Sequence, residues 1–447
     1  MEKTTNASKT ETKRINPNVA FVSEYKNISY ESAKDEMDYI KKEFGIIYKE
    51  YIAGNIWKYK SFAKKHQAIK KILEKDVKYL QEICDDTGWS MEEAREKAEY
   101  AKKKFNLSFR QYSRYRFFAC TDEQIAARME VWNANTKKYS EIVMNESGWD
   151  YNTVRRHMRR YFALYGIAEA NYVAYRAWEL DDEKMDSYAR QQISEKLWPK
   201  YNVKSDTRVL ADKLRFDQVY KDYIGRKFWI NRDSTYEEFV DFLDGVETIF
   251  IKPIEAGGGN GAEKIKVAGD TKALYENLMS RERVLVEECI VQHKAISEIS
   301  PNSVNTIRVV ALQDDNGVHI LCTNMRFGIH EAVDNLSQGG VVADIDTATG
   351  VIVTDAVDGK GNVYLTHPVT DKQFKGFKVP NWDKVIKTAT DAMGVLDGIN
   401  YVGWDIAVCE DKAVIVEGNT MPDLELVQLP YAKVKKGMKY LFDPYLK

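Results

Sequence analysis

The chain has 447 residues, of which 66 are Lys or Arg and 68 are Asp or Glu, so its formal net charge is -2. A chain of this length is too long for one ordinary core and predicts two or three domains. The balanced charge gives no overall attraction to nucleic acid, which we therefore exclude as a partner.

Residues 1–27 are predicted to be disordered, because the first segment, MEKTTNASKTETKRINPN, is polar and lacks the apolar stretch of a signal peptide. No run of 18 or more apolar residues occurs in the chain, so the sequence predicts no transmembrane segment and a cytoplasmic location. The five cysteines are scattered and odd in number, which is typical of reduced core residues.

Residues 28–204 are predicted to form a helical module, because Lys, Arg, Glu, Tyr and Trp dominate, Gly is sparse and apolar residues recur at helical spacing. The module contains three copies of one unit. The copies begin at Ser29, Ser90 and Asp150, which are 61 and then 60 residues apart. Such a repeat is typical of stacked helical units.

Each copy is predicted to be a helix, a turn and a second helix. The opening Ser or Asp side chain can cap a first turn, and Glu93 would complete a capping box in the second copy. Gly45, Asn106 and Gly166 stand where a helix would end in a left-handed residue. Repeated apolar positions either pack neighbouring units together or bind a ligand. They are Ala33, Ala94 and Val154; Phe44, Phe105 and Tyr165; Tyr51, Tyr112 and Tyr172.

The third copy contains VRRHMRRYF, in which two pairs of arginines are four residues apart and form basic stripes on one helix. The stripes consist of Arg155 with Arg159 and Arg156 with Arg160. They are either a solvated surface or a dock for an anionic partner, such as a diphosphate-linked carrier or an acidic polymer. A protein partner of the repeats is the other possibility.

After residue 204, β-branched runs and glycines become frequent. ETIFIKP and AEKIKVAG are predicted to be two strands, separated by a loop with Gly257, Gly258, Gly259 and Gly261. Such a loop exposes backbone N–H groups that can close over phosphates, although a mobile turn would have the same composition. It matches neither the Walker nor the dinucleotide-binding glycine pattern.

Two further segments place carboxylates on predicted strands. RVLVEECI is a short strand that ends in a pair of glutamates. GWDIAVCEDKAVIVEGNTMPD predicts a two-stranded unit in which Glu417 and Asn419 share a face and Asp405 lies across from them. These are hard oxygen ligands of the kind that Mg²⁺ takes, although Asp405 alone would suit a structural ion pair.

Between these segments, NMRFGIHEAVDNLSQGG carries Arg326 on a predicted strand and then a polar loop with Asp334 and Asn335. The loop is either a flap beside the bound phosphates or a long hairpin shaped by its glycines.

In their order, these segments resemble the ATP-grasp superfamily, and specifically the sugar-transfer-associated ATP-grasp group found with polysaccharide biosynthesis. The resemblance covers about residues 205 to 440. It rests on ADKLRF, IFIKP, the glycine loop, LVEECI, NTIRVV, DNLSQGGVVADID and VEGNTMP.

The resemblance implies roles for matching residues. Lys213 and Lys252 would contact ATP phosphates, while Arg308 and Arg326 would act at the transferred phosphoryl group. The strand that ends at Ile290 would hold the adenine through its backbone, with Glu287 and Glu288 at the nucleotide's edge. The expected Mg²⁺ ligands are Asp405, Glu417 and Asn419, and the expected lid glycines are Gly257, Gly258, Gly259 and Gly261.

The implied fold is α+β, with the helical repeat module followed by a smaller ATP-grasp subdomain over 205–290 and a larger one over 291–447. The implied activity is an ATP- and Mg²⁺-dependent ligase that joins a carboxylate to an amine or hydroxyl through an acyl-phosphate. Its acceptor would be a small or carrier-linked anion of cell-surface polysaccharide or related biosynthesis.

ATP-grasp ligases commonly begin with a small α/β domain, and here the helical module stands in its place, so the acceptor does not follow from better-known ligases. A phosphotransferase and a nucleotide-sensing scaffold are the alternative functions.

Overall fold

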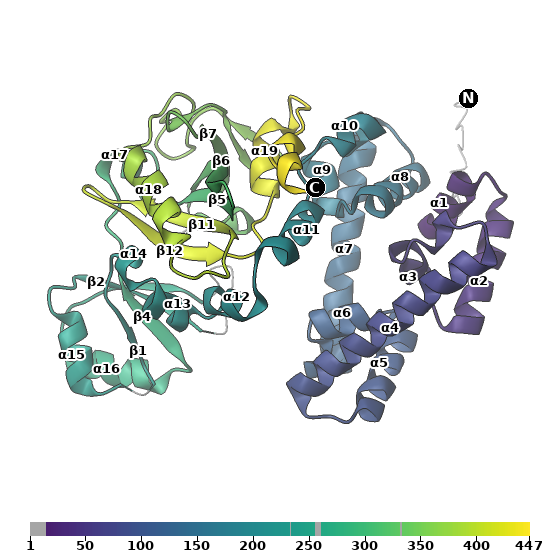
Figure 1. Cartoon of the computed structure of the whole chain (residues 1–447), viewed down its shortest axis with the longest axis horizontal. Coiled ribbons are helices and arrows are strands. Elements are labelled where there is room, and N and C mark those ends of the chain that lie inside the picture. Colours follow the sequence, from purple (N-terminus) through teal and green to yellow (C-terminus); the bar gives the residue numbers. More distant parts are fainter. Residues whose placement is uncertain (1–14, 233, 255–260, 331–332) are drawn as a thin grey trace, which may run out of the picture. The chain divides into compact units, whose positions relative to one another are not determined.

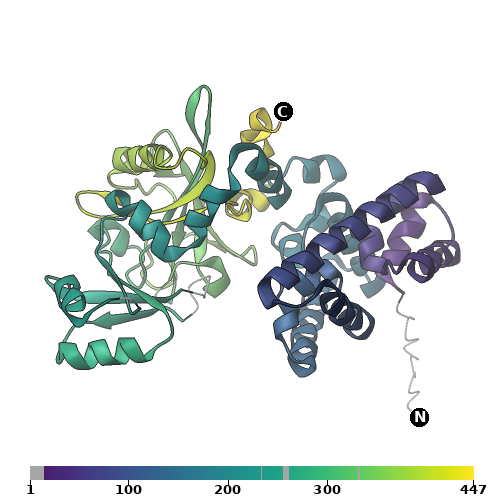
Figure 2. The same ribbon diagram turned by 60° about the horizontal axis from the view of Figure 1, so that its bottom comes forward.

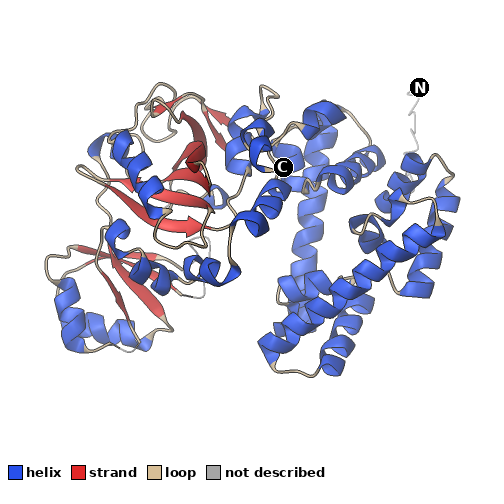
Figure 3. Ribbon diagram, in the orientation of Figure 1, coloured by secondary structure: helices blue, strands red, loops and turns tan. Residues whose placement is uncertain are grey.

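The computed structural model describes residues 15–232, 234–254, 261–330 and 333–447 (Figure 1). The chain divides into two compact units, Met1–Val173 and Ala174–Lys447. The described part of the first unit is helical, whereas the second contains two β-sheets and the helices that cover them (Figure 3). In the part of the chain that the structure describes, no helix is long and apolar enough to cross a membrane.

Helix α1 (Pro17–Lys26) corrects the prediction that all of residues 1–27 are disordered. The Asn16 side chain accepts a hydrogen bond from the backbone N–H of Asn18 and caps the helix. The apolar residues of α1 from Val19 to Val22 are buried, and the helix packs against α2 (Tyr30–Phe44) and α8 (Tyr151–Tyr165). This short apolar run is hidden between polar flanks in the sequence, and tertiary burial stabilises it.

The same order of elements recurs three times along the chain: a helix of 15 residues, a helix of 6 residues and a 3₁₀ turn. After α2 and α8, the third long member is α5 (Met91–Phe105). The short helices are α3 (Tyr48–Ala53), α6 (Phe109–Arg114) and α9 (Glu169–Ala174), and the turns are η1 (Ile56–Lys58), η2 (Phe117–Ala119) and η3 (Ala177–Glu179). Two helices of 26 residues, α4 (Phe62–Thr87) and α7 (Asp122–Ser147), follow the first two copies (Figure 2).

The predicted helix caps are confirmed in all three copies. Ser29, Ser90 and Asp150 accept hydrogen bonds from backbone N–H groups of the first turn. Gly45, Asn106 and Gly166 end the helices with φ of 68°, 54° and 68°. The predicted capping box at Glu93 is wrong, because this carboxylate instead pairs with Lys97 at 3.7 Å, one helical turn further on.

The arginine stripes of α8 are not a row of open guanidinium groups. Arg155 pairs with Glu169 at 2.5 Å, and Arg156 pairs with Glu24 at 3.2 Å. Burial lowers the pKa of Arg159 to about 10, and its guanidinium lies 4.9 Å from the centre of the Phe162 ring. Carboxylates of the same unit therefore balance the charges of Arg155 and Arg156, which weakens the electrostatic reason to expect a bound anion here.

The second unit begins with a series of helices that leads into the sheets. They are α10 (Asp182–Asp186), α11 (Gln191–Tyr201), α12 (Lys204–Ala211), α13 (Lys213–Val219) and α14 (Lys221–Ile224). The composition change near residue 204 therefore falls within a helical segment and not at the first strand, which starts at Phe228.

The smaller sheet is antiparallel, with strand order β1-β4-β2-β3. Its strands are β1 (Phe228–Ile230), β2 (Thr248–Pro253), β3 (Glu263–Lys266) and β4 (Val284–Glu288). The predicted strands at 247–253 and 262–269 are confirmed as the β2–β3 hairpin. Helices α15 (Tyr236–Leu243) and α16 (Thr271–Ser280) pack on it through a core that includes Trp229, Phe239 and Leu278.

The larger sheet has the order β10-β9-β7-β6-β5-β11-β12, with β8 paired to β7, and its pairs are antiparallel. The strands are β5 (Ile307–Asp314), β6 (Gly317–Phe327), β7 (Val341–Asp346), β8 (Val351–Ile352), β9 (Ala356–Asp358), β10 (Val363–Tyr364), β11 (Tyr401–Val408) and β12 (Ala413–Asn419). The accompanying helices are α17 (Lys294–Ser297), α18 (Trp382–Ala392) and α19 (Glu425–Ala432).

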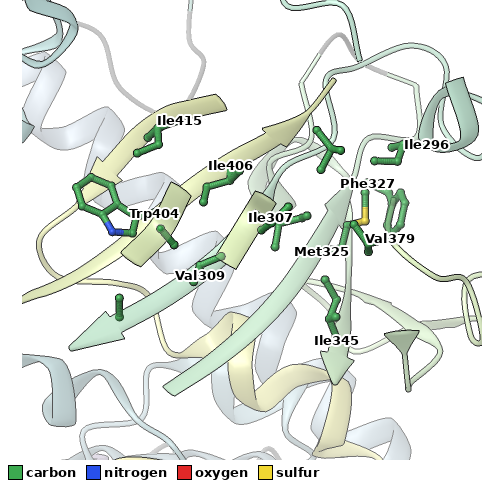
Figure 4. Packing of buried hydrophobic residues seen from close by; sticks show 14 of the residues in the cluster. Ile296, Ile307, Val309, Met325, Phe327, Ile345, Val379, Trp404, Ile406 and Ile415 are labelled. Atoms are coloured by element: carbon green, nitrogen blue, oxygen red, sulfur yellow. The ribbon is translucent and has the colours of Figure 1, made fainter. Parts of the chain in front are cut away.

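The two faces of this sheet bury different clusters. On one face, Ile307, Val309 and Trp404 join residues of α18 in the main core, and Figure 4 shows these three side chains. On the other face, alternate residues such as Val310 and Tyr401 pack with residues of α11 and α19. Successive side chains of a strand point to opposite faces, so Arg308 and Asp405 lie on the α11–α19 side.

Candidate functional site

A row of polar side chains crosses five adjacent strands on this second face. The strand register places Glu417 opposite Asp405, Asp405 opposite Arg308, Arg308 opposite Asn324, and Asn324 opposite Asp344. Directly opposed residues have side chains close enough to interact. The antiparallel register therefore gathers residues that are up to about a hundred positions apart in the sequence into one line.

Asp405 lies between Glu417 and Arg308 in this row and is completely buried. Its Oδ2 accepts hydrogen bonds from Arg308 Nη2 at 3.1 Å and from Arg326 Nη2 at 2.8 Å, and its Oδ1 accepts one from Arg308 Nε. Burial alone would raise the pKa of Asp405, but the charges of Arg308 and Arg326 outweigh it and hold the pKa well below its usual range. Asp405 is therefore an ionised anchor for two arginines.

Arg326 is held in place by Thr306, directly before β5, and by Asn335 of the predicted polar loop. Its Nε donates a hydrogen bond to Thr306 Oγ1 at 3.0 Å, and its Nη1 donates one to Asn335 Oδ1 at 3.3 Å. Asp334 accepts hydrogen bonds from both the backbone N–H and the hydroxyl of Thr306, at 2.8 and 2.6 Å. Residues 331 and 332 of the predicted flap lie outside the described residues. The described part of that loop thus fixes an arginine of the site.

Glu417 and Asn419 stand beside Asp405 on β12, as the sequence predicted. Asn419 Nδ2 lies 3.3 Å from Glu417 Oε1 and 3.5 Å from Asp405 Oδ2. Glu417 lies inside the cavity, where solvent still reaches its side chain. The surrounding protein and then the charge of the neighbouring Asp405 raise the pKa of its carboxyl group. A bound cation would relieve this repulsion between the two carboxylates.

The donor set fits a hard cation only in part. Glu417 and the amide oxygen of Asn419 are ligands that Mg²⁺ accepts, whereas both oxygens of Asp405 are engaged by arginines. In the described residues, no three His, Cys, Asp or Glu side chains cluster as a metal site. The two groups on β12 are thus the better candidates to hold a metal that also takes oxygens from a ligand or water.

These groups line a cavity of about 740 Å³ in the second unit. Its other lining residues divide into an apolar and a cationic part. The apolar part includes Leu210, Phe250, Ile290, Val304 and Val416, and the cationic part includes Lys213, Arg226, Lys252, Arg308 and Arg326. A cavity of this size with an apolar wall and convergent charges is typical of a small-molecule site.

Lys252 belongs to a buried charge cluster at the wall of the cavity. It pairs with Glu287, which also accepts a hydrogen bond from Arg226 Nη2 at 2.7 Å. Arg226 Nη1 donates to the backbone carbonyl of Ile415 at 2.8 Å and so connects the smaller sheet to β12. Burial alone would raise the pKa of Glu287, but the charges of Arg226 and Lys252 hold it below its usual range. Burial and the Glu287 charge raise the pKa of Asp217, which lies 3.3 Å from Arg226.

Three further residues predicted to contact the nucleotide, Lys213, Glu288 and Ile290, line the same cavity. Lys213 Nζ donates to the backbone carbonyls of Pro253 and Ile254 at 2.9 and 2.8 Å, which keeps its ammonium at the end of β2. Glu288 and Ile290 line the wall formed by β4 and the residues after it. Of the predicted glycine loop, only Gly261 is described, with φ of 71°; Gly257, Gly258 and Gly259 lie outside the described residues.

Sequence reasoning missed Arg226 and Asp217, and it did not give Thr306 a role. Arg226 stands alone in the sequence IGRKFWI, 61 residues before Glu287, with no motif around it. Only the fold shows that it is buried between two carboxylates. For Thr306, its position two residues before Arg308 in NTIRVV was the one available signal.

Comparison with known proteins gives one family. The family model described as sugar-transfer associated ATP-grasp matches residues 192–439. Comparison with curated proteins finds no match.

Among solved structures, the chain is similar to the ATP-grasp ligase PsnB complexed with a phosphomimetic variant of its minimal precursor, Mg and ADP. The identity is 16%, the TM-score is 0.29, and 50% of this chain and 52% of PsnB are covered. D-alanyl-alanine synthetase A from Vibrio cholerae is 12% identical, with a TM-score of 0.32 and coverage of 53% and 65%. D-alanine–D-alanine ligase from Bacillus anthracis complexed with ATP is 13% identical, with a TM-score of 0.31 and coverage of 53% and 65%. The chain thus spans about half the length of PsnB.

Proposed function

This chain belongs to the sugar-transfer associated ATP-grasp family, and from this premise we propose that it is an ATP- and Mg²⁺-dependent ligase. It joins a carboxylate to an amine or hydroxyl through an acyl-phosphate. The observation that carries the proposal is the meeting of four cationic side chains with Glu417 and Asn419 around one cavity. The cations are Lys213, Lys252, Arg308 and Arg326.

The two parts of the cavity suit the two parts of a nucleotide. The apolar wall that includes Phe250, Ile290 and Val416 would bury a flat base, and the backbone that follows β4 would bind its edge. Lys252, whose side chain is 20% exposed, can reach a phosphate while Glu287 holds it in place. Phosphates pair well with lysine and arginine, so the charged part of the cavity would bind the triphosphate.

Glu417 and Asn419 would hold Mg²⁺ at the phosphates, where the ion neutralises charge that develops during phosphoryl transfer. Asp405 orients Arg308 and Arg326 towards the same region through its buried ion pairs. Positioned positive charge of this kind is the main requirement of phosphoryl transfer. The predicted contribution of the glycine loop to phosphate binding remains a prediction.

The proposed reaction has two steps. A carboxylate oxygen of the substrate forms a bond to the γ-phosphorus, and the bond between that phosphorus and the β–γ bridging oxygen breaks, so ADP leaves and an acyl-phosphate forms. The amine or hydroxyl of the acceptor then bonds to the acyl carbon, inorganic phosphate leaves, and the acceptor loses a proton. Cell-surface polysaccharide or related biosynthesis is the setting proposed for this ligation, on the strength of the family's description.

Isotope transfer tests this chemistry. The chain is incubated with ATP, Mg²⁺, candidate acceptors and candidate carboxylates labelled with ¹⁸O, and the phosphate released is analysed by mass spectrometry. A ligase of the proposed type moves one labelled oxygen from the carboxylate to inorganic phosphate. A phosphorylated acceptor with no free phosphate would identify a phosphotransferase instead, and nucleotide binding without turnover of any pair would favour a scaffold.

A further inference from the structure

The first compact unit contains a groove of about 440 Å³ beside the start of α4. Lys64, Lys71 and Lys75 line it from the helix, and Asn55 and Tyr59 line it from the preceding turn. No Asp or Glu is among its described lining residues. The groove is therefore concave, and the charged side chains among its described lining residues are all positive.

These three lysines differ from Lys65 and Lys70 on the same helix. Lys65 pairs with Glu36 at 2.8 Å, and Lys70 lies 4.0 Å from Glu74. For the three groove lysines, no ion pair occurs with any residue that the structure describes, and all three are exposed. Their charge is thus available to a ligand, whereas Lys65 and Lys70 each face a carboxylate.

The second copy of the repeat has larger side chains at the corresponding place. Helices α4 and α7 have 26 residues each and end before Gly88 and Gly148, so that Ile72 corresponds to Trp132. Gly54 corresponds to Tyr115, and both follow a six-residue helix directly. In the second copy these aromatic rings lie against each other, with centroids 5.2 Å apart.

The first copy replaces this aromatic pair with a glycine and an isoleucine that touch. A side chain added at Gly54 would collide with Ile72. Gly54 and Ile72 line the groove together with the three lysines, whereas large aromatic side chains stand at the two corresponding positions of the second copy. Packing between units does not require this arrangement, since the second copy is built without it.

We propose that the groove binds an extended anionic ligand with at least two phosphate or carboxylate groups. Lys64 and Lys71 are two helical turns apart and Lys71 and Lys75 are one turn apart, which sets their attachment points roughly 10 and 6 Å from each other along the axis. One compact monoanion cannot meet all three ammonium groups, whereas a chain of anionic groups can. Tyr59 and Gln67 add an aromatic ring and an amide to the same wall.

The test is isothermal titration of the full chain at low ionic strength with two probes, inorganic tripolyphosphate and a trimer of galacturonic acid. The groove variant combines Lys64→Gln, Lys71→Gln and Lys75→Gln. The matched control combines Lys70→Gln, Lys78→Gln and Lys103→Gln, which removes the same charge from exposed positions outside the groove. A third variant, Gly54→Tyr with Ile72→Trp, copies the aromatic pair of the second copy into the groove.

At least one probe is expected to bind the wild type. The groove variant should raise the Kd for that probe by about tenfold or more, because three lysine contacts are lost. The control variant should change the same Kd by about twofold or less. The third variant, Gly54→Tyr with Ile72→Trp, should no longer bind the probe, while its midpoint of thermal unfolding stays that of the wild type. The probe that binds more tightly assigns phosphate or carboxylate chemistry to the ligand. Absence of binding by both probes, or equal loss in the groove and control variants, would overturn the proposal.

Discussion

Asp405 and Arg308 lie directly opposite each other in the β11–β5 pair, and both oxygens of the carboxylate contact the guanidinium. Arg326 reaches the same carboxylate from β6. The role of Asp405 is thus to hold two arginines at the cavity, and a direct bond from Asp405 to Mg²⁺ would compete with these ion pairs. The remaining metal ligands of the prediction, Glu417 and Asn419, carry no such arginine contacts among the described residues.

Glu417→Gln should abolish turnover while leaving the fold intact. The side chain is open to solvent, so its charge contributes to ligand binding and not to the core. Loss of a charge that stabilises the transition state commonly lowers kcat by about 10²-fold or more. The measurement is ADP release, with thermal unfolding as the check on stability. An ADP release rate close to that of the wild type would place the metal elsewhere.

Asp405→Asn should reduce both activity and stability. The residue is completely buried, and the substitution leaves two buried guanidinium groups without their shared carboxylate. Removing one partner of a buried ion pair costs about 3 kcal/mol of unfolding free energy or more. Urea unfolding of this variant should therefore show a clear loss that Glu417→Gln lacks, and equal stability of the two variants would contradict the assignment of Asp405 as the arginine anchor.

Lys252→Gln should raise KM for ATP and lower kcat, with limited loss of stability. Glu287 keeps its second cation, Arg226, in this variant, so the buried carboxylate does not become unpaired. Lys266→Gln removes an exposed lysine from the adjacent β3 strand and serves as the control. Steady-state kinetics at varied ATP concentration distinguish the two. The same KM for both variants would show that Lys252 does not contact the nucleotide.

Asp76→Asn should change the pH dependence of stability. Burial and then the charge of Glu50 raise the pKa of Asp76 to about 7, despite the opposing charges of Lys102 and Arg95. The folded state therefore binds this proton more tightly than the unfolded chain, so unfolding free energy falls as the pH rises from about 4 to 7.

The Asn variant has no proton to lose and should flatten that fall. Urea unfolding at pH 5 and pH 8 measures it, with the expected difference between the two proteins being on the order of a few kcal/mol. Parallel pH profiles for Asp76→Asn and the wild type would show that Asp76 is ionised in the folded state throughout this range.

Sequence patterns that span a few residues predicted those parts of the site and of the repeats that depend only on neighbouring residues. The alternation in GWDIAV and VIVEGN predicted that Asp405, Glu417 and Asn419 share a face, and the β11–β12 register confirms it. The capping residues of the repeats were predicted for the same reason, because a cap depends on one helical turn.

Contacts between distant segments could not be predicted in this way. Arg226 contacts Glu287 and the backbone of Ile415, which are 61 and 189 residues away. The partners of Arg155 and Arg156 likewise come from other helices, so the sequence showed a basic stripe where the fold places carboxylates. The apolar run of α1 was too short to predict a helix without the helices that cover it.

The proposed function depends most on a cavity that binds ATP with Mg²⁺ held by Glu417 and Asn419 of β12. Calorimetric titration of a non-hydrolysable ATP analogue, with and without Mg²⁺, tests this directly in the wild type and in Glu417→Gln. Tighter binding with Mg²⁺ is expected in the wild type, and the variant should keep Mg²⁺-free binding but lose most of that gain. An equal gain from Mg²⁺ in both proteins, or no binding of the analogue by the wild type, would contradict the account.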